Sequence, residues 1–284
     1  MVTLDAFEDY LKISGKSGNT IKGYVLNVKI YLKWFQDSFG QVCTVLYRQN
    51  ILEFVSYLKN VKNQNAKTIN HKLSSLRSYN EFLIAEGVQE DAVIHKTDMI
   101  KVQTAYASPT QVSEIEVKQF MQKVLGSKDS RNYAIVTLLA YTGMRISEAL
   151  SIRLKDLNLQ TGECIIRNGK GDKQRDVIMN SKLILAIREY MKNRLQYTTA
   201  SSSPYLFVSK KNDTLDRTVV NRIFQRYSKV ITPHQLRHYY CTNALEKGFT
   251  IHEVANQAGH SNINTTLLYT NPDKAKLKKK MELL

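Results

Sequence analysis

The sequence contains little cysteine, proline or tryptophan. Its 284 residues include three cysteines, four prolines and one tryptophan. The three cysteines, Cys43, Cys164 and Cys241, are widely spaced and odd in number. They fit neither a disulfide framework nor a zinc site, so we expect reduced thiols in a cytoplasmic protein. No proline precedes Pro109, which allows uninterrupted helices over the first hundred residues.

Long hydrophobic runs are also absent. The longest obvious one covers residues 134–140, far short of the roughly 20 residues that a membrane span requires. The first residues include Asp5, Glu8 and Asp9 and lack the basic-then-apolar pattern of a secretion signal. We therefore expect neither a membrane protein nor a secreted one.

Negative charge is scarce as well. The chain has 41 Lys and Arg against 25 Asp and Glu, a formal net charge of +16. The electric field of so positive a protein attracts polyanions. Nucleic acid is therefore the first candidate partner, and an acidic membrane surface is the alternative. Residues 1–103 carry a net +3 and residues 104–284 a net +13. The second part should therefore hold the phosphate chemistry.

The first part has the apolar spacing of helices. Apolar residues recur at three- and four-residue steps through 21–35, and residues 17–20 before them supply capping side chains. Further apolar stripes cover 51–58 and 69–83. We predict a bundle of three or four helices over residues 1–103.

The second part, residues 104–284, follows a linker near 101–109 and is also mainly helical. Helical patterns start again near Val112 and continue to about residue 269. One clear hairpin interrupts them: strand-like runs at 163–167 and 175–178 flank a turn rich in glycine at 168–172. The predicted fold class is mainly α, with a helical N-terminal domain and an α-rich second domain that contains a small β-hairpin or sheet.

Four short segments of the second part carry candidate chemistry. They are Thr142-Gly-Met-Arg145, Gly169-Lys-Gly171, His234-Gln-Leu-Arg237 and Gly259-His260, and Tyr269 follows nine residues after the last. Each segment alone is a weak signal. Their order and spacing together are specific.

This set resembles the signature of the tyrosine recombinase (phage integrase) family, which reads Arg, Lys, His-x-x-Arg, His or Trp, and Tyr. The matching positions are Arg145, Lys170, His234, Arg237, His260 and Tyr269. Size and organisation look most like the Xer-like and transposon-encoded (TnpI-type resolvase) branch. The resemblance implies a core-binding, SAM-like DNA-binding domain over 1–103 and a catalytic domain with a C-terminal tail over 104–284.

Elementary chemistry supports these residue types. Arg145 and Arg237 suit the negative charge that grows on a phosphodiester, because guanidiniums stay protonated and bond in a bidentate fork. Tyr269 would be the nucleophile, and its phenol needs a base, for which His234 is the candidate. Lys170 would return a proton to the leaving 5′ oxygen. His260 would bind the phosphate or position the tyrosine, and no metal or cofactor is required.

Other residues offer rival readings. Tyr239 and Tyr240 are alternative nucleophiles, although a helix would turn them away from the face of His234 and Arg237. Lys173 and Arg175 are alternatives to Lys170 or contacts to DNA backbone. Glu148 is expected to orient an arginine, and His238 to make a structural hydrogen bond.

The sequence thus predicts a site-specific DNA recombinase that cuts and rejoins strands through a 3′-phosphotyrosyl intermediate. The expected partner is double-stranded DNA, bound by a homotetramer on two recombination sites in the cytoplasm, in association with the nucleoid. In the family, the C-terminal segment docks on a neighbouring subunit, which is the role expected of residues 274–284. Two alternatives stay open: a type IB topoisomerase-like enzyme that relaxes DNA, and an inactive DNA-binding protein with the same fold.

Overall fold

The chain divides into two units, Met1–Thr104 and Ala105–Leu284. The computed structural model describes residues 3–102, 112–167, 174–260, 264–267 and 281–282. Most of the predicted linker and nearly all of the predicted tail lie outside these residues.

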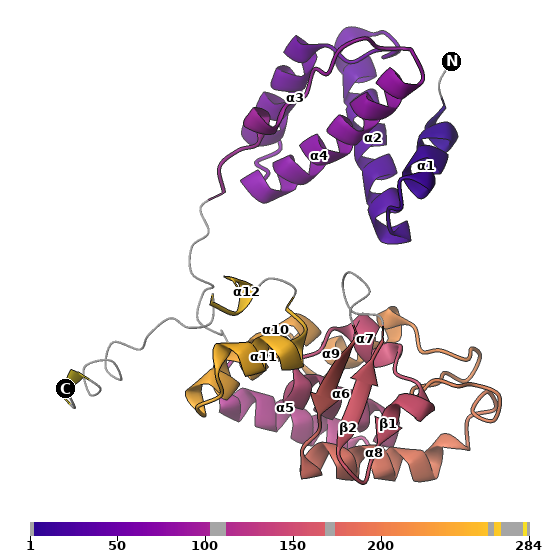
Figure 1. Ribbon diagram of the computed structural model, residues 1–284, viewed down its shortest axis with the longest axis vertical. Coiled ribbons are helices and arrows are strands. Elements are labelled where there is room, and N and C mark those ends of the chain that lie inside the picture. Colours follow the sequence, from indigo (N-terminus) through magenta and orange to yellow (C-terminus); the bar gives the residue numbers. More distant parts are fainter. Residues whose placement is uncertain (1–2, 103–111, 168–173, 261–263, 268–280, 283–284) are drawn as a thin grey trace. The chain divides into compact units, whose positions relative to one another are not determined.

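Four α-helices form the described part of the first unit (Figure 1). They are α1 (Leu4–Ile13), α2 (Gly18–Phe39), α3 (Arg48–Asn60) and α4 (Ala66–Ala85), followed by a short 3₁₀ turn, η1 (Lys96–Asp98). The predicted cap is present, since Ser17 Oγ accepts from the backbone N–H of Thr20. The helices bury the predicted apolar stripes in one core, as expected for a bundle.

Aromatic side chains fix the packing of this bundle. Tyr31 and Phe54 join α2 to α3 with ring centroids 5.1 Å apart in an edge-on arrangement. Phe7 of α1 meets Tyr79 of α4 in the same geometry, also at 5.1 Å. Because edge-on pairs add favourable electrostatics to burial, these contacts hold the first and third helices to the rest.

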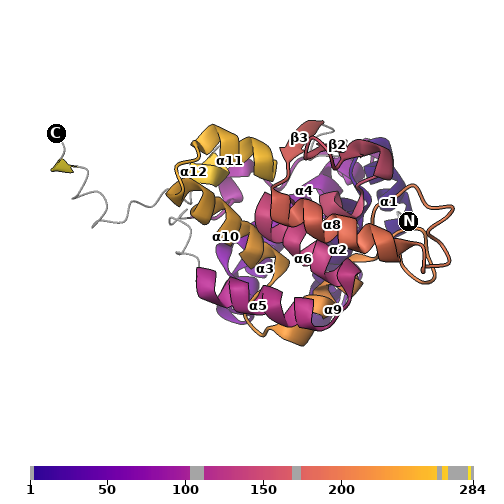
Figure 2. The same cartoon turned by 90° about the horizontal axis from the view of Figure 1, so that it is seen from below.

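The second unit combines helices with a small sheet (Figures 1 and 2). Its helices are α5 (Glu114–Gly126), α6 (Ser130–Thr142), α7 (Ile146–Leu150), α8 (Ser181–Arg194), α9 (Arg217–Tyr227), α10 (Pro233–Glu246), α11 (Ile251–Ala258) and α12 (Asn264–Leu267), with a 3₁₀ turn, η2 (Leu154–Asp156). Its strands are β1 (Leu157–Asn158), β2 (Glu163–Ile166) and β3 (Arg175–Ile178). The fold class is mainly α with a small sheet, as predicted.

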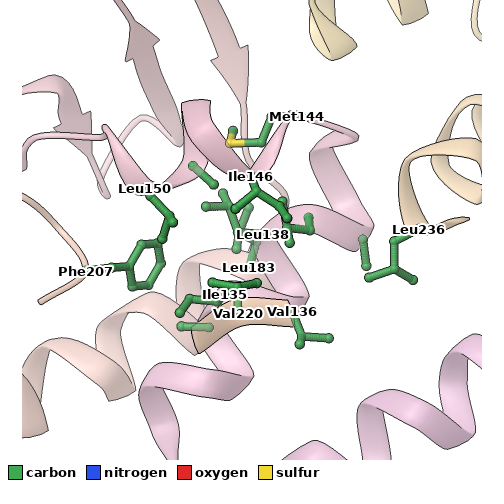
Figure 3. Close-up of a cluster of buried hydrophobic side chains, with 14 of the residues drawn as sticks. Ile135, Val136, Leu138, Met144, Ile146, Leu150, Leu183, Phe207, Val220 and Leu236 are labelled. Carbon is green, nitrogen blue, oxygen red and sulfur yellow. The ribbon is translucent and has the colours of Figure 1, made fainter. Parts of the chain in front are cut away.

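Helix α6 is the centre of this unit. It contacts α5, α8, α9 and α10, which surround it in Figure 2. Residues 134–140, the longest apolar run in the sequence, are all buried here, because a helix surrounded by others needs an apolar surface on every side. Figure 3 shows Ile135 and Leu138 of α6 among side chains from the neighbouring elements, including Leu183 and Val220.

The sheet contains one strand more than the sequence predicts. The predicted hairpin is present as β2 and β3, which pair antiparallel with Ile166 opposite Arg175 and Glu163 opposite Ile178. A two-residue strand, β1, pairs antiparallel with the other edge of β2. Because two residues are too few to show alternation, the sequence gives no sign of this strand.

None of the helices in the described parts of the chain combines the length and the apolar character that a membrane span requires.

Candidate active site

Two helix C-termini of the second unit share one arginine. The Nη1 atom of Arg237, on α10, donates to Gly143 O and to Ala258 O, both at 2.6 Å. Gly143 caps the end of α6, and Ala258 is the last residue of α11. The last carbonyls of a helix lack partners within the helix and carry the negative end of its dipole, so they stabilise a guanidinium. Arg237 is only 7% exposed.

Gly143 is required at the end of α6. Its φ is +61°, in the left-handed region that disfavours side chains. A Cβ atom there would also lie 2.3 Å from Cδ1 of Tyr240. The tight turn aims the Gly143 carbonyl at Arg237 and places Arg145, two residues later, at the N-cap of α7.

Arg145 is fixed at the start of α7 by three hydrogen bonds. Its backbone N–H donates to Glu148 Oε2 at 2.9 Å, and its Nη1 donates to Glu148 Oε1 at 2.9 Å and to Gly259 O at 2.7 Å. Its side chain is 34% exposed. The guanidinium is therefore anchored on one side and accessible on the other.

Glu148 links two arginines. Its side chain is 3% exposed and accepts from Arg145 and from Arg175. Burial alone would raise the pKa of this carboxyl, but hydrogen bonds from Arg175 and from the Arg145 backbone, with both guanidinium charges, lower it below the usual range. Glu148 is therefore ionised at neutral pH, and it orients two arginines where the sequence predicted one.

Arg175, at the start of β3, pairs with the buried carboxylate of Glu148. Its side chain is 9% exposed, and its Nη1 and Nη2 atoms donate to the two oxygens of Glu148 at 3.3 and 2.9 Å. The sequence-based interpretation of Arg175, as a DNA contact or an alternative to Lys170, did not include this ion pair.

His234 and His238 form a pair on α10. Their Nε2 atoms are 2.7 Å apart, and their rings are nearly perpendicular at 86°. Burial, followed by the charges of His234 and Arg237, lowers the pKa of His238 to about 4. His238 is therefore neutral at pH 7, and it makes the hydrogen bond expected of it from the sequence.

His260 follows the end of α11 and contacts α12. Its Nδ1 lies 2.7 Å from Oγ1 of the buried Thr266. Burial lowers the pKa of His260 to about 4, and the charges of Arg237, Arg145 and Arg175 act in the same direction. His260 is therefore neutral at pH 7 and can donate one hydrogen bond without charge.

An open pocket of about 470 Å³ joins these groups. It is lined by Met144, Arg145, Ile146, Ser147, Arg217, Asn221, Thr232, Pro233, His234, Arg237, His260 and Thr265. Four of the six residues predicted for the site, Arg145, His234, Arg237 and His260, thus line one cavity. Lys170 and Tyr269 lie outside the described residues, as does Lys173.

The electrostatics of this region suit an anion. The guanidiniums of Arg145 and Arg175 pair with the carboxylate of Glu148, and that of Arg237 donates to backbone carbonyls. These four side chains therefore carry a net charge of +2. A phosphodiester carries one negative charge and gains more when an oxyanion attacks it. Within the described parts of the chain, no three His, Cys, Asp or Glu side chains come together as a metal site.

The rival tyrosines of α10 have structural contacts instead. Tyr239 packs against the core of the second unit, and burial raises its pKa to about 12. Tyr240 packs against Gly143 and the small cluster around Cys241, and burial raises its pKa strongly. A phenol whose ionisation is opposed by burial is a poor nucleophile.

Sequence reasoning did not foresee several contributors to this region. Thr266 holds His260, and Arg217 and Asn221 line the pocket from α9. Thr266 lies in the stretch 258–266 that carries His260 in the family resemblance, but its contact with His260 was not foreseen. Arg217 and Asn221 lie in no motif, and a surface arginine or asparagine on a helix is common. Arg175 alone gave a usable signal, since it is the first residue of a predicted strand that leaves the Lys170 turn.

Comparison with known proteins identifies the family. The Phage integrase family model matches residues 111–276, and the Phage integrase N-terminal SAM-like domain model matches residues 4–87. A TnP I resolvase of Bacillus thuringiensis is 66% identical over 278 residues, which is 98% of each chain. The tyrosine recombinase XerA of Pyrococcus furiosus is 31% identical over 98% of this chain and 92% of its own.

A solved structure supports the same fold. The crystal structure of the XerH site-specific recombinase bound to palindromic difH substrate superposes with a TM-score of 0.73 at 24% identity, over 92% of this chain and 78% of that one. At this identity the likeness speaks for the fold alone. With both family models and the full-length relatives, the chain belongs to the phage integrase family of site-specific tyrosine recombinases.

Proposed function

We propose that this recombinase cuts and rejoins DNA strands with Tyr269 as the nucleophile and the Arg145–Arg237 pocket as the phosphate site. The observation that carries the proposal is the convergence of Arg145, Arg237 and His260 on one open pocket whose buried partners leave an excess of positive charge. A buried cation held by neutral carbonyls keeps its charge for a ligand.

In the proposed reaction, the Tyr269 oxygen attacks the scissile phosphorus, and the bond from phosphorus to the 5′ oxygen breaks. His234 takes the phenol proton, and Lys170 gives a proton to the leaving 5′ oxygen. The 3′-phosphotyrosyl bond keeps the energy of the cut phosphodiester, so a 5′ hydroxyl of another strand can reverse the step without ATP.

Arg145 and Arg237 would stabilise the charge that develops on the non-bridging oxygens. Pre-oriented cations in a partly buried site are more effective than solvated ones, because they need no reorganisation as the charge develops. In this site, guanidiniums supply the positive charge that metal ions supply in many other phosphoryl-transfer enzymes. Neutral His260, held by Thr266, would add one hydrogen bond to the phosphate or to the tyrosine.

The two units would share the DNA. We assign core binding to residues 1–103 and catalysis to residues 104–284, where most of the net positive charge lies. The active assembly would be a homotetramer on two sites in the cytoplasm, with residues 274–284 contacting a neighbouring subunit. The 66% identity to a resolvase over nearly the full length of both chains favours resolution of DNA that carries two sites.

A trapping experiment tests the nucleophile. The substrate is a cognate site with a nick just beyond the scissile phosphate, so that the short 5′-hydroxyl product diffuses away and the covalent protein–DNA adduct accumulates. The wild type should form adduct. Tyr269→Phe should bind the same DNA with a similar Kd and form none, because it lacks the attacking oxygen.

Tyr239→Phe is the matched control, since it removes a neighbouring phenol that packs against the core. It should form adduct at a rate within about threefold of the wild type. Adduct from Tyr269→Phe, or its loss in Tyr239→Phe, would contradict the assignment. Relaxation of plasmid that lacks any site, without recombinants, would favour the topoisomerase-like alternative.

A further inference from the structure

Arg175 makes contacts that the proposed reaction does not use. It opens β3, pairs in the ladder with Ile166, and points its guanidinium toward α7 and α11. Both Nη atoms bond to Glu148, and Nη2 also lies 3.4 Å from Ala258 O. A strand residue far from α7 in sequence therefore reaches the carboxylate that holds Arg145.

Gly259 makes room for this guanidinium. A Cβ atom on Gly259 would lie 2.4 Å from Cζ of Arg175 and within 2.7 Å of both terminal nitrogens. Its φ of +72° independently favours glycine. The same Gly259 accepts from Arg145 Nη1 through its carbonyl, at 2.7 Å. One residue thus contacts both arginines, and His260 follows it directly.

A second set of hydrogen bonds joins β3 to α11. The side-chain amide of Gln257 donates to Ile178 O at 2.6 Å and accepts from Ile178 N–H at 3.1 Å. Arg175 and Gln257 therefore fix the two ends of β3 to the last turn of α11. The sheet and the helix end that precedes His260 should move as one body.

From these contacts we infer that Arg175 is a positioning residue for strand cleavage: through Glu148 and Gly259 it holds the Arg145 guanidinium in place against the scissile phosphate. This inference rests on the proposed function. Both terminal nitrogens of Arg175 donate to Glu148, so we assign it a role that acts through Arg145.

The expected effect follows from the geometry of Arg145. Its side chain is a third exposed, and its guanidinium is held by Glu148 and Gly259. Removing the two hydrogen bonds from Arg175 to Glu148 leaves Glu148 free to shift together with Arg145. A displacement of about 1 Å at a reacting group can lower the rate about 100-fold. Lysine cannot replace the fork, because its single ammonium cannot bond both carboxylate oxygens in one plane.

Arg175→Lys is the test variant, assayed on the nicked substrate under single-turnover conditions. Single-site Kd should stay within about threefold of the wild type, and the cleavage rate should fall by about 100-fold. On a substrate whose scissile phosphate carries methyl in place of one non-bridging oxygen, the defect should shrink at least tenfold. That linkage is neutral and no longer needs the Arg145 charge, so a merely structural defect would persist unchanged.

Arg167→Lys is the matched control. Arg167 lies at the other end of the hairpin turn and pairs with buried Asp156, outside the pocket. It should cleave both substrates like the wild type. Equal cleavage by Arg175→Lys and wild type, or a defect of the same size on the neutral linkage, would overturn the inference.

A charge-balanced pair separates positioning from stability. The double variant Glu148→Gln/Arg175→Met removes both buried charges. Its Tm should therefore lie closer to the wild-type value than the Tm of either single variant, while its cleavage rate stays at least 30-fold below that of the wild type. Recovery of cleavage together with Tm would overturn the inference. Because the wild type must form a Tyr269-dependent adduct in the same assay, failure of the inference is distinguishable from failure of the proposed function.

Discussion

Two buried arginines of the second unit, Arg194 and Arg237, have similar bonds and different surroundings. Arg194, 3% exposed on α8, donates to four backbone carbonyls, those of Ala200, Ser203, Tyr205 and Leu206, at 2.7 to 3.1 Å. Arg237, 7% exposed, also bonds to backbone carbonyls. Arg194 closes a loop over the core, whereas Arg237 lines an open pocket.

The difference shows that burial and hydrogen bonding do not by themselves mark a catalytic arginine. Four carbonyls around Arg194 engage Nε and both terminal nitrogens in fixed directions, so this side chain serves the loop at 200–206. Arg237 instead joins two helix ends beside Arg145 and His260. What distinguishes the candidate catalytic arginine, Arg237, from the structural Arg194 is that it is accessible to a ligand and has positively charged neighbours.

The largest expected effect is on catalysis at Arg237. Arg237→Lys should cleave the nicked substrate about 10³-fold more slowly, because one oriented donor to the developing charge is lost. Its Tm should fall by no more than about 4 °C, because an ammonium can keep one of the carbonyl bonds. Single-turnover cleavage and thermal unfolding of the same preparation measure both. A Tm loss above about 10 °C would show Arg237 to be structural like Arg194.

The opposite pattern is expected at Arg194. Arg194→Lys leaves most of its buried carbonyls without donors, which should cost about 3 kcal/mol of stability. For a chain of this size the Tm should then fall by roughly 6 to 12 °C. Cleavage at 20 °C, well below unfolding, should stay within about threefold of the wild type. A large cleavage defect in folded protein would remove the contrast between the two arginines.

The sequence distinguishes these arginines only through motif order. His234-x-x-Arg237 lies in register with Arg145 and His260, and that spacing led to four of the twelve residues that line the pocket. Helices α2, α3 and α4 were also predictable, because their apolar periods and the cap before α2 are local features. Strand β1 was not, since a two-residue strand depends on its partner.

The contacts of Arg175 could not be predicted from the sequence, because they depend on tertiary structure. On a hairpin, the alternation of side chains along a strand places each one on one face or the other, but it does not predict that a buried carboxylate lies on that face. Glu148 lies 27 residues earlier in the chain and Gly259 lies 84 residues later. The pair of contacts exists only after α7, β3 and α11 come together.

The smallest expected effect is on the pH dependence of stability, and it comes from the imidazoles near Arg237. The pKa of His260 in the folded chain is about 4 against an ordinary value of 6.5, through burial and the nearby guanidiniums. Between these values the unfolded chain binds more protons than the folded one. The stability contributed by neutral His260 is therefore present above about pH 6.5 and is lost as the pH falls toward 4.

His260→Gln should weaken this dependence, because a neutral amide can still bond Thr266 and binds no proton. The Tm loss between pH 7.5 and pH 5 should be smaller than in the wild type by a degree or two. His238, whose pKa is also about 4, contributes in the same direction, so the double variant His238→Gln/His260→Gln should flatten the profile further. His252→Gln, on the exposed face of α11, is the control and should follow the wild type.

Since Arg194 has no histidine among its bonded partners, Arg194→Lys should lower the Tm by the same amount at both pH values. A pH profile that His260→Gln leaves unchanged would mean that burial and the guanidiniums do not hold His260 neutral, and its assignment as an uncharged hydrogen-bond donor to the phosphate or the tyrosine would fail.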